Sequence, residues 1–427
     1  MRIGPSVLLP LIICTWLGSA WAAPLRLPDL LSRVAETNPE LHALATEIAA
    51  REGAALQAGL RPNPELSLDL DNFAGTDELE GFESAEITLS LSQDFELGDK
   101  RRLRRQEALL EQELSRWALR SGELEILKGA ARTFVEILAT QRRLELSREL
   151  LTLAESTLAT VEARVEAGKV SPVEGTRARI ELASARAQHQ RAGFDLDAAR
   201  QRLGAFSPAQ PPAFDTAEGE LDFIAPLPSL QALEARLPQT PQLARLGTAL
   251  ERQQAALRLA DARKIPDLNL SLGVRNQRES GANALVAGVA LSLPLFDRNQ
   301  GGLAEARAEL EKTRFENSAA RSEARAALAE AWQNLAGTRQ KTLILRDDIL
   351  PDARSAFESL EYGYREGKFD FLQLLDGQRT LFDLQGRYLE SLLEYQLARV
   401  ELHRLAAAPL AGLLGPAPTA LEIEVTP

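Results

Sequence analysis

The sequence is poor in sulfur and in aromatic side chains. It has one cysteine and one methionine, and aromatic residues make up only 5% of its 427 positions. The cysteine, Cys14, lies in an amino-terminal segment that we expect to be removed, which leaves no thiol for disulfide or nucleophilic chemistry. Copper binding through thioethers is also excluded, because the only methionine is Met1.

The amino terminus has the pattern of a cleaved export signal. Arg2 precedes a short apolar core, and the Ala-Trp-Ala that ends at Ala22 fits a signal-peptidase site. The core is shorter than the ~18 apolar residues that a membrane-spanning helix needs. We therefore expect residues 1–22 to be a signal peptide cut after Ala22. Ile13 precedes Cys14 where a lipoprotein signal has a small residue, which argues against a lipid anchor.

Charge and missing motifs exclude further classes. The net charge of −12 argues against nucleic acid as a partner, and no later run is long and apolar enough to predict a transmembrane helix. The sequence also lacks a glycine-rich phosphate loop and a nucleophile elbow. The histidines are scattered, without the spacing of metal ligands: His42, His189 and His403. We therefore predict neither an enzyme nor a chain with a bound metal or cofactor.

Four stretches alternate strictly between apolar and polar residues, which predicts strands with one apolar and one polar face. The apolar rows are Leu66, Leu68 and Leu70; Ile87, Leu89 and Leu91; Leu268, Leu270, Leu272 and Val274; and Leu285, Ala287, Val289, Leu291 and Leu293. The opposite rows include Ser67, Asp69 and Asp71; Thr88, Ser90 and Ser92; Asn269, Ser271 and Arg275; and Gly288, Ala290 and Ser292. Each run has about nine to eleven residues, the length of a tilted membrane strand.

Two interpretations of these strands are open. They form either a soluble sheet packed on helices or the lipid-facing wall of a membrane β-barrel. The export signal, the matched lengths and the polar opposite faces favour the barrel, because lipid offers no water to unpaired backbone groups. Four strands cannot close a barrel, since the smallest bacterial examples use about eight, so several chains must share one. Asp69, Asp71 and Arg275 would then line the lumen.

The chain is also a tandem duplication. Each strand pair is preceded by a helical segment and followed by a long helical tract that a Gly-Lys turn interrupts. The corresponding positions are Pro39 and Pro241, Pro64 and Pro266, and Phe95 and Phe296. We expect a first repeat at 23–205, a Pro-rich extended linker at 206–227, a second repeat at 228–406 and a poorly ordered tail at 407–427.

The helical tracts contain heptad repeats. No proline interrupts the chain from Arg101 to Glu166, which predicts a helix about 100 Å long. One seam of large residues runs through Ile137, Leu144, Leu151, Leu158 and Val165, beside Thr140, Ser147, Ala154 and Val161. The other repeat has Leu374, Leu381, Tyr388, Tyr395 and Leu402, beside Gly377, Leu384, Ser391, Ala398 and Leu405. These patterns predict close antiparallel packing in a supercoiled assembly, with an isolated coiled-coil dimer or a globular bundle as the alternative.

The sequence resembles the TolC-like family of outer-membrane efflux proteins over essentially the whole mature chain. The resemblance rests on the duplicated order, on "RPNPELSL" before the first strand, on "FELGDKRR" after the second, and on the "EAGK" and "REGK" turns. The residues of these motifs are most similar to those of the cobalt–zinc–cadmium branch of this family. The resemblance implies a homotrimer with a shared twelve-stranded barrel, a helical tunnel in the periplasm, a periplasmic adaptor protein and an inner-membrane RND pump as partners.

The resemblance also implies site residues. The hairpin tips, which would contact the adaptor, are Gly168, Lys169, Val170, Ser171 and Pro172, and Gly367, Lys368, Phe369 and Asp370. The periplasmic aperture would lie at Glu174, Gln373 and Asp376. Gln373 stands where the family often has an acidic residue, so one of two expected acidic rings is missing. The alternatives are that Asp376 is an ordinary solvated acid and that the glycines only form turns.

By the topology that the resemblance implies, the basic cluster after the second strand would meet lipid phosphates at the periplasmic rim, unless it is a solvated helix start: Lys100, Arg101, Arg102, Arg104 and Arg105. We therefore expect an outer-membrane channel of a Gram-negative bacterium that passes divalent cations such as cobalt, zinc or cadmium by diffusion. The alternatives are a drug or protein export channel of the same fold and a periplasmic coiled-coil adaptor.

Overall fold

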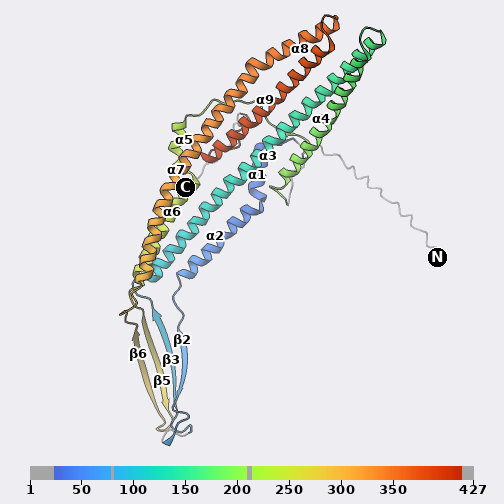
Figure 1. The fold of residues 1–427 in the computed structure, drawn as a ribbon. Coiled ribbons are helices and arrows are strands. Elements are labelled where there is room, and N and C mark those ends of the chain that lie inside the picture. The colour runs from blue at the N-terminus through green and yellow to red at the C-terminus, as the bar shows by residue number, and fades with distance from the viewer. Residues whose placement is uncertain (1–23, 78–80, 209–213, 416–427) are drawn as a thin grey trace, which may run out of the picture.

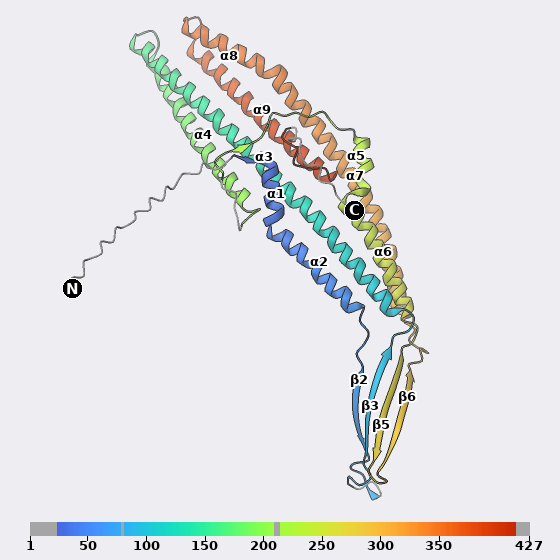
Figure 2. The ribbon, with the colours of Figure 1, turned by 180° about the vertical axis from the view of Figure 1, so that it is seen from behind.

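The computed structural model describes residues 24–77, 81–208 and 214–415. The expected signal peptide therefore lies outside the described residues, as does the tail from 416 onward. The described chain is elongated, with a four-stranded sheet at one end and the ends of two helical hairpins at the other (Figures 1 and 2). Short helices surround the long ones about halfway along the molecule (Figure 1).

The order of elements repeats, as the sequence predicts. The helices are α1 Leu27–Thr37, α2 Pro39–Ala58, α3 Lys100–Glu166, α4 Pro172–Gly204, α5 Leu230–Arg236, α6 Pro241–Ala262, α7 Gln300–Ile344, α8 Leu350–Arg365 and α9 Phe371–Leu405. The strands are β1 Leu25–Arg26, β2 Glu65–Asp71, β3 Glu86–Phe95, β4 Ala217–Glu218, β5 Leu268–Gln277 and β6 Ala282–Leu291. Thus each half has a helix, a strand pair and a long hairpin.

The main sheet is antiparallel in the order β2-β3-β5-β6. Leu68 pairs with Leu89, Leu89 with Val274, and Val274 with Leu285, so the apolar rows of all four strands lie on one face. The predicted alternation is confirmed, but the length of β2 and the end of β6 differ. β2 has only seven residues, and β6 ends at Leu291, before Pro294, so Leu293 lies outside the strand.

The two long tracts differ in their continuity. α3 is one uninterrupted helix of 67 residues, as its lack of proline predicts. The matching tract of the second half contains Pro351, and a π-helical segment at Leu345–Ile349 lies between α7 and α8. Proline has no amide hydrogen and its ring crowds the preceding turn, and the wider turn of a π-helix accommodates both effects. A helix therefore continues past Pro351.

The heptad seams lie in the helix contacts, and in the first hairpin the small seam is buried more deeply than the large one. Distal α3 packs antiparallel on α4, and Ser147, Ala154 and Val161 are buried there. Leu151 and Leu158 remain partly exposed. In α9, Gly377 lies under Leu360 of α8, where an added Cβ would come within 2.4 Å of a Leu360 methyl. Small residues thus set the close spacing of these helices.

The largest core lies halfway along the helices. Phe134 and Ile137 of α3 are fully buried there, together with Leu30 of α1 and Leu203 of α4. The expectation of a poorly ordered tail is wrong for Ala407–Gly415, because Leu413 is also fully buried in this core. An alanine- and proline-rich composition suggested disorder, but three leucines in this short segment have an apolar site to fill.

Residues 214–227 of the linker contain no helix and add a small parallel sheet. Leu25 of β1 pairs with Ala217 of β4, and Gln141 of α3 bonds both backbone groups of Ala217. Farther on, the linker crosses α9, where the Gln396 side chain donates to the carbonyls of Leu221 and Phe223. The linker therefore packs against both hairpins.

Candidate functional site

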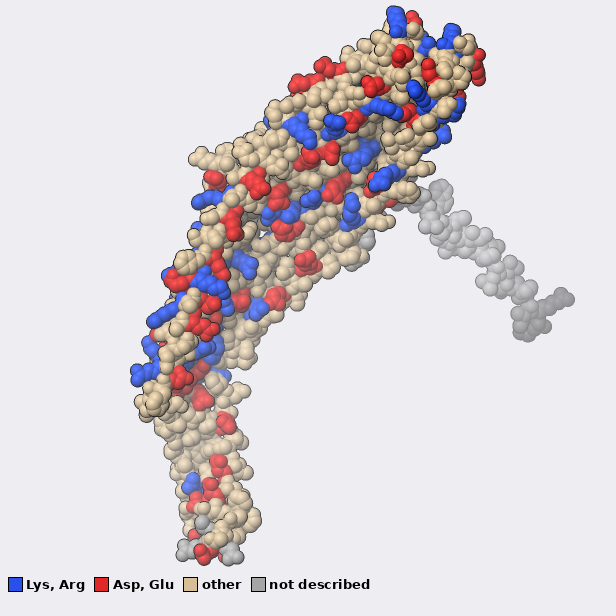
Figure 3. All heavy atoms as spheres, in the orientation of Figure 1, with Lys and Arg blue, Asp and Glu red and all other residues tan. Residues whose placement is uncertain are grey.

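The sheet has one apolar and one polar, largely acidic face. Leu66, Leu68, Leu285 and Val289 are each at least 69% exposed on the apolar face. The surface near the sheet carries fewer charges than the helical part (Figure 3). On the polar face of the four strands lie Glu65, Asp69, Asp71, Glu86 and Asp94, against a single basic residue, Arg275. The sheet thus separates an apolar surface from an acidic one.

The predicted lumen residues are neighbours across the strands. Asp69 lies opposite Thr88, and Thr88 lies opposite Arg275. The Arg275 Nε donates to the Thr88 hydroxyl at 3.0 Å, and the guanidinium forms an ion pair with Glu86 at 3.1 Å. Sequence reasoning missed Glu86, although it continues the polar row of its strand. Arg275 is therefore neutralised by Glu86, while no ion pair of Asp69 or Asp71 appears among the described residues.

The end of the first hairpin is an open turn between α3 and α4. Gly168 has a φ of 66°, the left-handed conformation that favours glycine, and the Lys169 amide donates to the Arg164 carbonyl at 2.9 Å. Ser171 caps α4 by accepting from the Val173 amide at 3.3 Å. Nothing lies within 4 Å of the place where a Gly168 Cβ would be. The first hairpin therefore ends in the turn that the sequence predicts, and the space around Gly168 is open.

The end of the second hairpin packs against its own helices. Gly367 has a φ of 76°, and the Lys368 amide donates to the Gly363 carbonyl at 2.8 Å. The Phe369 ring covers Gly363, where an added Cβ would meet it at 2.1 Å. Next to this turn, Phe371 is only 2% exposed. The same glycine-lysine turn is therefore supported by aromatic packing here and left open in the first hairpin.

Arg164 joins the two hairpins, and sequence reasoning missed it. Its guanidinium donates to the Tyr364 carbonyl at 2.8 Å and lies over the Tyr364 ring, 4.5 Å from the ring centre. Tyr364 also contacts the ring of Phe371. Val161 and Phe357 belong to the same buried cluster. The available signal was the aromatic residues that flank "REGK" and have no counterpart around "EAGK".

Burial raises the pKa of the Tyr364 hydroxyl above its ordinary value, and the nearby positive charge of Arg164 offsets part of this shift. Glu174 acts in the same direction as burial, because a negative charge disfavours a phenolate. Glu174 is partly buried and therefore lies near the second hairpin rather than entirely in solvent.

The other predicted aperture residues differ in their surroundings. Gln373 closes a capping box with Asp370: the Asp370 carboxylate accepts from the Gln373 amide at 2.9 Å, and the Gln373 side chain accepts from the Asp370 amide at 3.1 Å. Gln373 is thus part of the amino-terminal cap of α9. Asp376 is exposed on α9, and no described residue forms an ion pair with it.

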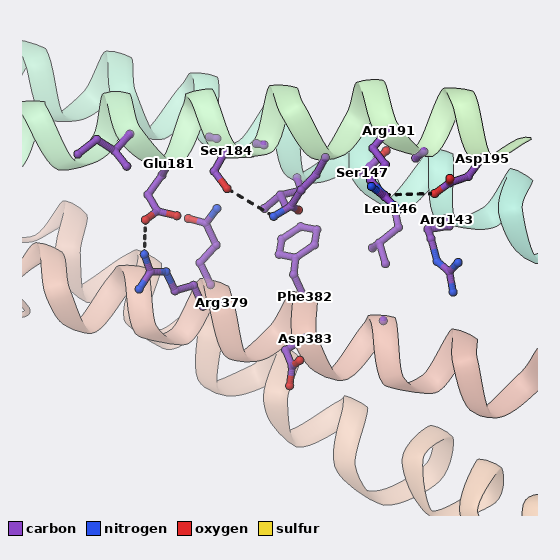
Figure 4. A pocket seen from close by; sticks show the side chains of 18 residues that line it. Arg143, Leu146, Ser147, Glu181, Ser184, Arg191, Asp195, Arg379, Phe382 and Asp383 are labelled. Atoms are coloured by element: carbon purple, nitrogen blue, oxygen red, sulfur yellow. Dashed lines mark hydrogen bonds and ion pairs between the residues drawn. The ribbon is translucent and has the colours of Figure 1, made fainter.

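A groove of about 930 Å³ separates the first hairpin from α9. Arg379 of α9 forms an ion pair with Glu181 of α4 across it, and Phe382 points from α9 toward α4 (Figure 4). The walls include the buried Ser147 and Ala154 of α3. Together with Arg164, this ion pair connects the hairpins along their distal halves.

Three residues of the predicted basic rim form ion pairs within the chain. Lys100 is 9% exposed and contacts Asp267 at 2.8 Å, and Arg102 contacts Asp99 at 2.9 Å. Arg104 contacts both oxygens of Glu96, at 2.5 and 3.0 Å. The remaining members, Arg101 and Arg105, form no ion pair with any residue that the structure describes. The cluster therefore fixes the junction of the sheet with α3, which its composition alone did not reveal.

The histidines are far apart. His189 shares a hydrogen bond with Ser147, His403 bonds the Pro409 carbonyl, and His42 lies on α2. Within residues 24–77, 81–208 and 214–415, no three His, Cys, Asp or Glu side chains come together as metal ligands. Among these same residues, no helix is both long enough and apolar enough to cross a membrane.

Comparison with known proteins agrees with this architecture. The family model described as outer membrane efflux protein matches residues 30–206 and again 232–408. The cobalt-zinc-cadmium resistance protein CzcC of Cupriavidus metallidurans is 34% identical over 384 residues, 90% of either chain. The nickel and cobalt resistance protein CnrC of the same organism is 29% identical over 333 residues, 74% of this chain and 79% of CnrC.

The fold is that of the TolC-like outer-membrane channels. The solved structure of CusC superposes with a TM-score of 0.78 at 16% identity, covering 91% of this chain and 94% of CusC. The chain belongs to the outer membrane efflux protein family. It is accordingly an efflux channel component, a transport protein rather than an enzyme.

Proposed function

We propose that this chain forms a homotrimeric outer-membrane duct through which divalent heavy-metal cations, such as cobalt, zinc or cadmium, leave a tripartite pump. The observation that carries this proposal is the sheet with exposed leucines on one face and five carboxylates against one guanidinium on the other. Closed with the sheets of two further copies, it presents its leucines to lipid and its acids to the lumen. The resistance proteins to which the chain is similar support a metal substrate.

The cations move by diffusion in this mechanism. The acidic lumen raises their local concentration, because a narrow low-dielectric pore focuses the field of its wall charges. The remaining parts of the pump are a periplasmic adaptor that contacts the two hairpin ends and an inner-membrane RND transporter that supplies the energy. Glu174 and Asp376 are the acidic residues proposed for the periplasmic aperture.

The substrate is tested by growth of a deletion strain on zinc, cobalt, cadmium, nickel, copper and silver, beside dyes and antibiotics. We expect sensitivity confined to a group of divalent metals and restored growth on complementation. Sensitivity to the organic compounds alone would show that the metal assignment is wrong and would leave the channel in place.

The lumen charges are tested in planar bilayers. Replacing Asp69 and Asp71 with asparagine should lower the cation-to-anion permeability ratio, whereas Arg275→Gln should raise or maintain it because Glu86 is then unpaired. An unchanged ratio in the double asparagine variant would contradict the proposed role of these acids.

The hairpin ends are tested with Gly168→Val and Gly367→Val. A β-branched residue is strained at a positive φ, so each variant should distort its turn and weaken adaptor contact. We expect reduced metal export with the trimer still in the outer-membrane fraction. Normal export in both variants would argue against adaptor contact at these ends.

A further inference from the structure

A small cavity lies beside the second half of the molecule, away from the hairpin ends and the sheet. It has a volume of about 260 Å³ and lies between the linker at Ala225–Pro228, α5, α7 and the carboxyl-terminal part of α9. Its apolar walls include Leu227 of the linker and one leucine of each of these helices: Leu233, Leu335 and Leu402. We call it the Arg399 pocket.

The polar lining of the Arg399 pocket is entirely basic or neutral. Arg236, Arg339 and Arg399 line it, together with His403 and Tyr395, and no aspartate or glutamate does. None of these three arginines forms an ion pair with a residue in the described part of the chain. The nearby Arg404, in contrast, forms ion pairs with Glu125 and Glu401. Positive charge therefore converges on a space that has no counter-ion among the described residues.

Arg399 is the most deeply buried of these cations, at 6% exposed. It donates to the Gln396 side chain at 3.0 Å and lies against the rings of Phe223 and Tyr395, 5.2 and 5.7 Å from their centres. A guanidinium has five N–H donors, and a buried one is costly to leave without an anion. Burial lowers the pKa of Arg399, the direction expected when no negative charge is near.

The other polar groups leave room for a ligand. Arg339 donates through its Nε to the Ala225 carbonyl at 3.1 Å, which leaves its terminal nitrogens available. His403 Nδ1 donates to the Pro409 carbonyl at 2.8 Å, because a carbonyl can only accept, and this fixes the ring. The Tyr395 hydroxyl accepts a hydrogen bond from the Ala225 amide at 2.9 Å. Hydrogen bonds of Arg339 and Tyr395 with the backbone of Ala225 thus fix the linker beside the pocket.

We propose that the Arg399 pocket binds a small organic acid, with its carboxylate on Arg399 and Arg339 and a compact apolar body against the leucines. The planar fork of a guanidinium matches the two oxygens of a carboxylate. The volume lies just below the range of ~300–1,000 Å³ typical of ligand pockets, which favours a fragment-sized ligand. Bound ligand would add contacts between Arg339 of α7 and Arg399 of α9 and raise the melting temperature.

The test uses the full-length protein in detergent, with benzoate as the probe and isothermal titration calorimetry as the measurement. We expect saturable binding of benzoate at one site per chain and at least tenfold weaker binding of benzamide, which has the same shape without the charge. Arg399→Gln should weaken benzoate binding at least tenfold. The control is Arg387→Gln, an exposed residue of the same helix that contacts Asp383, and it should leave binding unchanged.

Arg339→Gln covers the case in which Arg399→Gln fails to fold. Arg339 is partly exposed, so this variant should fold, and it should weaken benzoate binding several-fold. Inorganic phosphate is titrated beside benzoate, and saturation by phosphate alone would overturn the carboxylate assignment.

Three other results would overturn the proposal. They are no saturation by benzoate, equal binding of benzoate and benzamide, and undiminished benzoate binding in both Arg399→Gln and Arg339→Gln. A loss of trimer stability in Arg399→Gln without any benzoate binding would instead identify a carboxylate of a second copy as the partner of Arg399.

Discussion

The two hairpin ends have closely related turns in different surroundings. Gly168 and Gly367 adopt the same left-handed conformation, and each is followed by lysine. Around Gly168 the turn is open, whereas the Phe369 ring packs on Gly363 of its own hairpin and Phe371 is buried in the cluster that also contains Val161. The duplication thus conserved the turn, while the flanking aromatic residues made one end a packed unit and left the other held mainly by backbone hydrogen bonds.

The largest expected effect comes from the buried ring of the second end. Phe371→Ala removes a side chain that is 2% exposed and should cost about 3–5 kcal/mol of unfolding free energy. The measurement is chemical unfolding of the detergent-solubilised protein. Leu372→Ala in the same turn of helix, 53% exposed, and Val173→Ala in the first hairpin, 58% exposed, are the controls and should each cost well under ~1 kcal/mol. Equal costs at the three positions would show that the two ends do not differ in packing.

The next effect concerns the contact between the ends. Arg164→Gln removes a charged hydrogen bond to the Tyr364 carbonyl and the cation–π contact, and we expect a loss of about 1.5–3 kcal/mol. Arg148→Gln, at an exposed position of the same helix, serves as the control. Indistinguishable unfolding of the two variants would argue that the hairpins are held together without Arg164.

The helix caps should differ by a smaller amount. Asp370→Ala breaks a complete capping box and should cost about 1 kcal/mol. Ser171→Ala removes only one long hydrogen bond, at 3.3 Å, and should cost about half of that or less. Unfolding of both variants under one set of conditions gives the comparison, and a larger cost for Ser171→Ala would reverse it.

The smallest effect is confined to alkaline pH. The pKa of Tyr364 is higher in the folded than in the unfolded chain. The contribution of Tyr364 to the free energy of unfolding is fully present below the pKa of about 10 that its hydroxyl has in the unfolded chain. This contribution is lost as the pH rises through the higher pKa of the folded chain. Tyr364→Phe should therefore lose less stability than the unmodified protein above about pH 10. Tyr362→Phe, whose ring is 63% exposed, should behave like the unmodified protein.

Much of the architecture was predictable because it depends on local patterns. The alternation of apolar and polar residues around Leu68 and around Leu89 predicts two strands and the face that these leucines share. The absence of proline predicts the length of α3. The positive φ of Gly168 follows from a Gly-Lys turn that interrupts a heptad pattern. The repeated order of elements is equally visible in the spacing of the motifs.

The pairings were not predictable in the same way. The basic cluster at Lys100 suggested lipid contact, yet Lys100 is paired with Asp267 of the other repeat. Arg164 and Tyr364 are 200 positions apart in the sequence and meet only because two hairpins pack side by side. The leucines of the tail are buried for the same reason, since the cavity that receives Leu413 is formed by other segments.

The strands, the two-faced sheet, the long helices and the glycine turns follow from local sequence, because each depends on periodicity and local backbone preference. The packed fold sets which charges are neutralised, which hairpin end is packed, and the burial of Arg399 without a carboxylate partner among the described residues. Those properties depend on segments that are distant along the chain, and electrostatic and packing energies are set by distance in space.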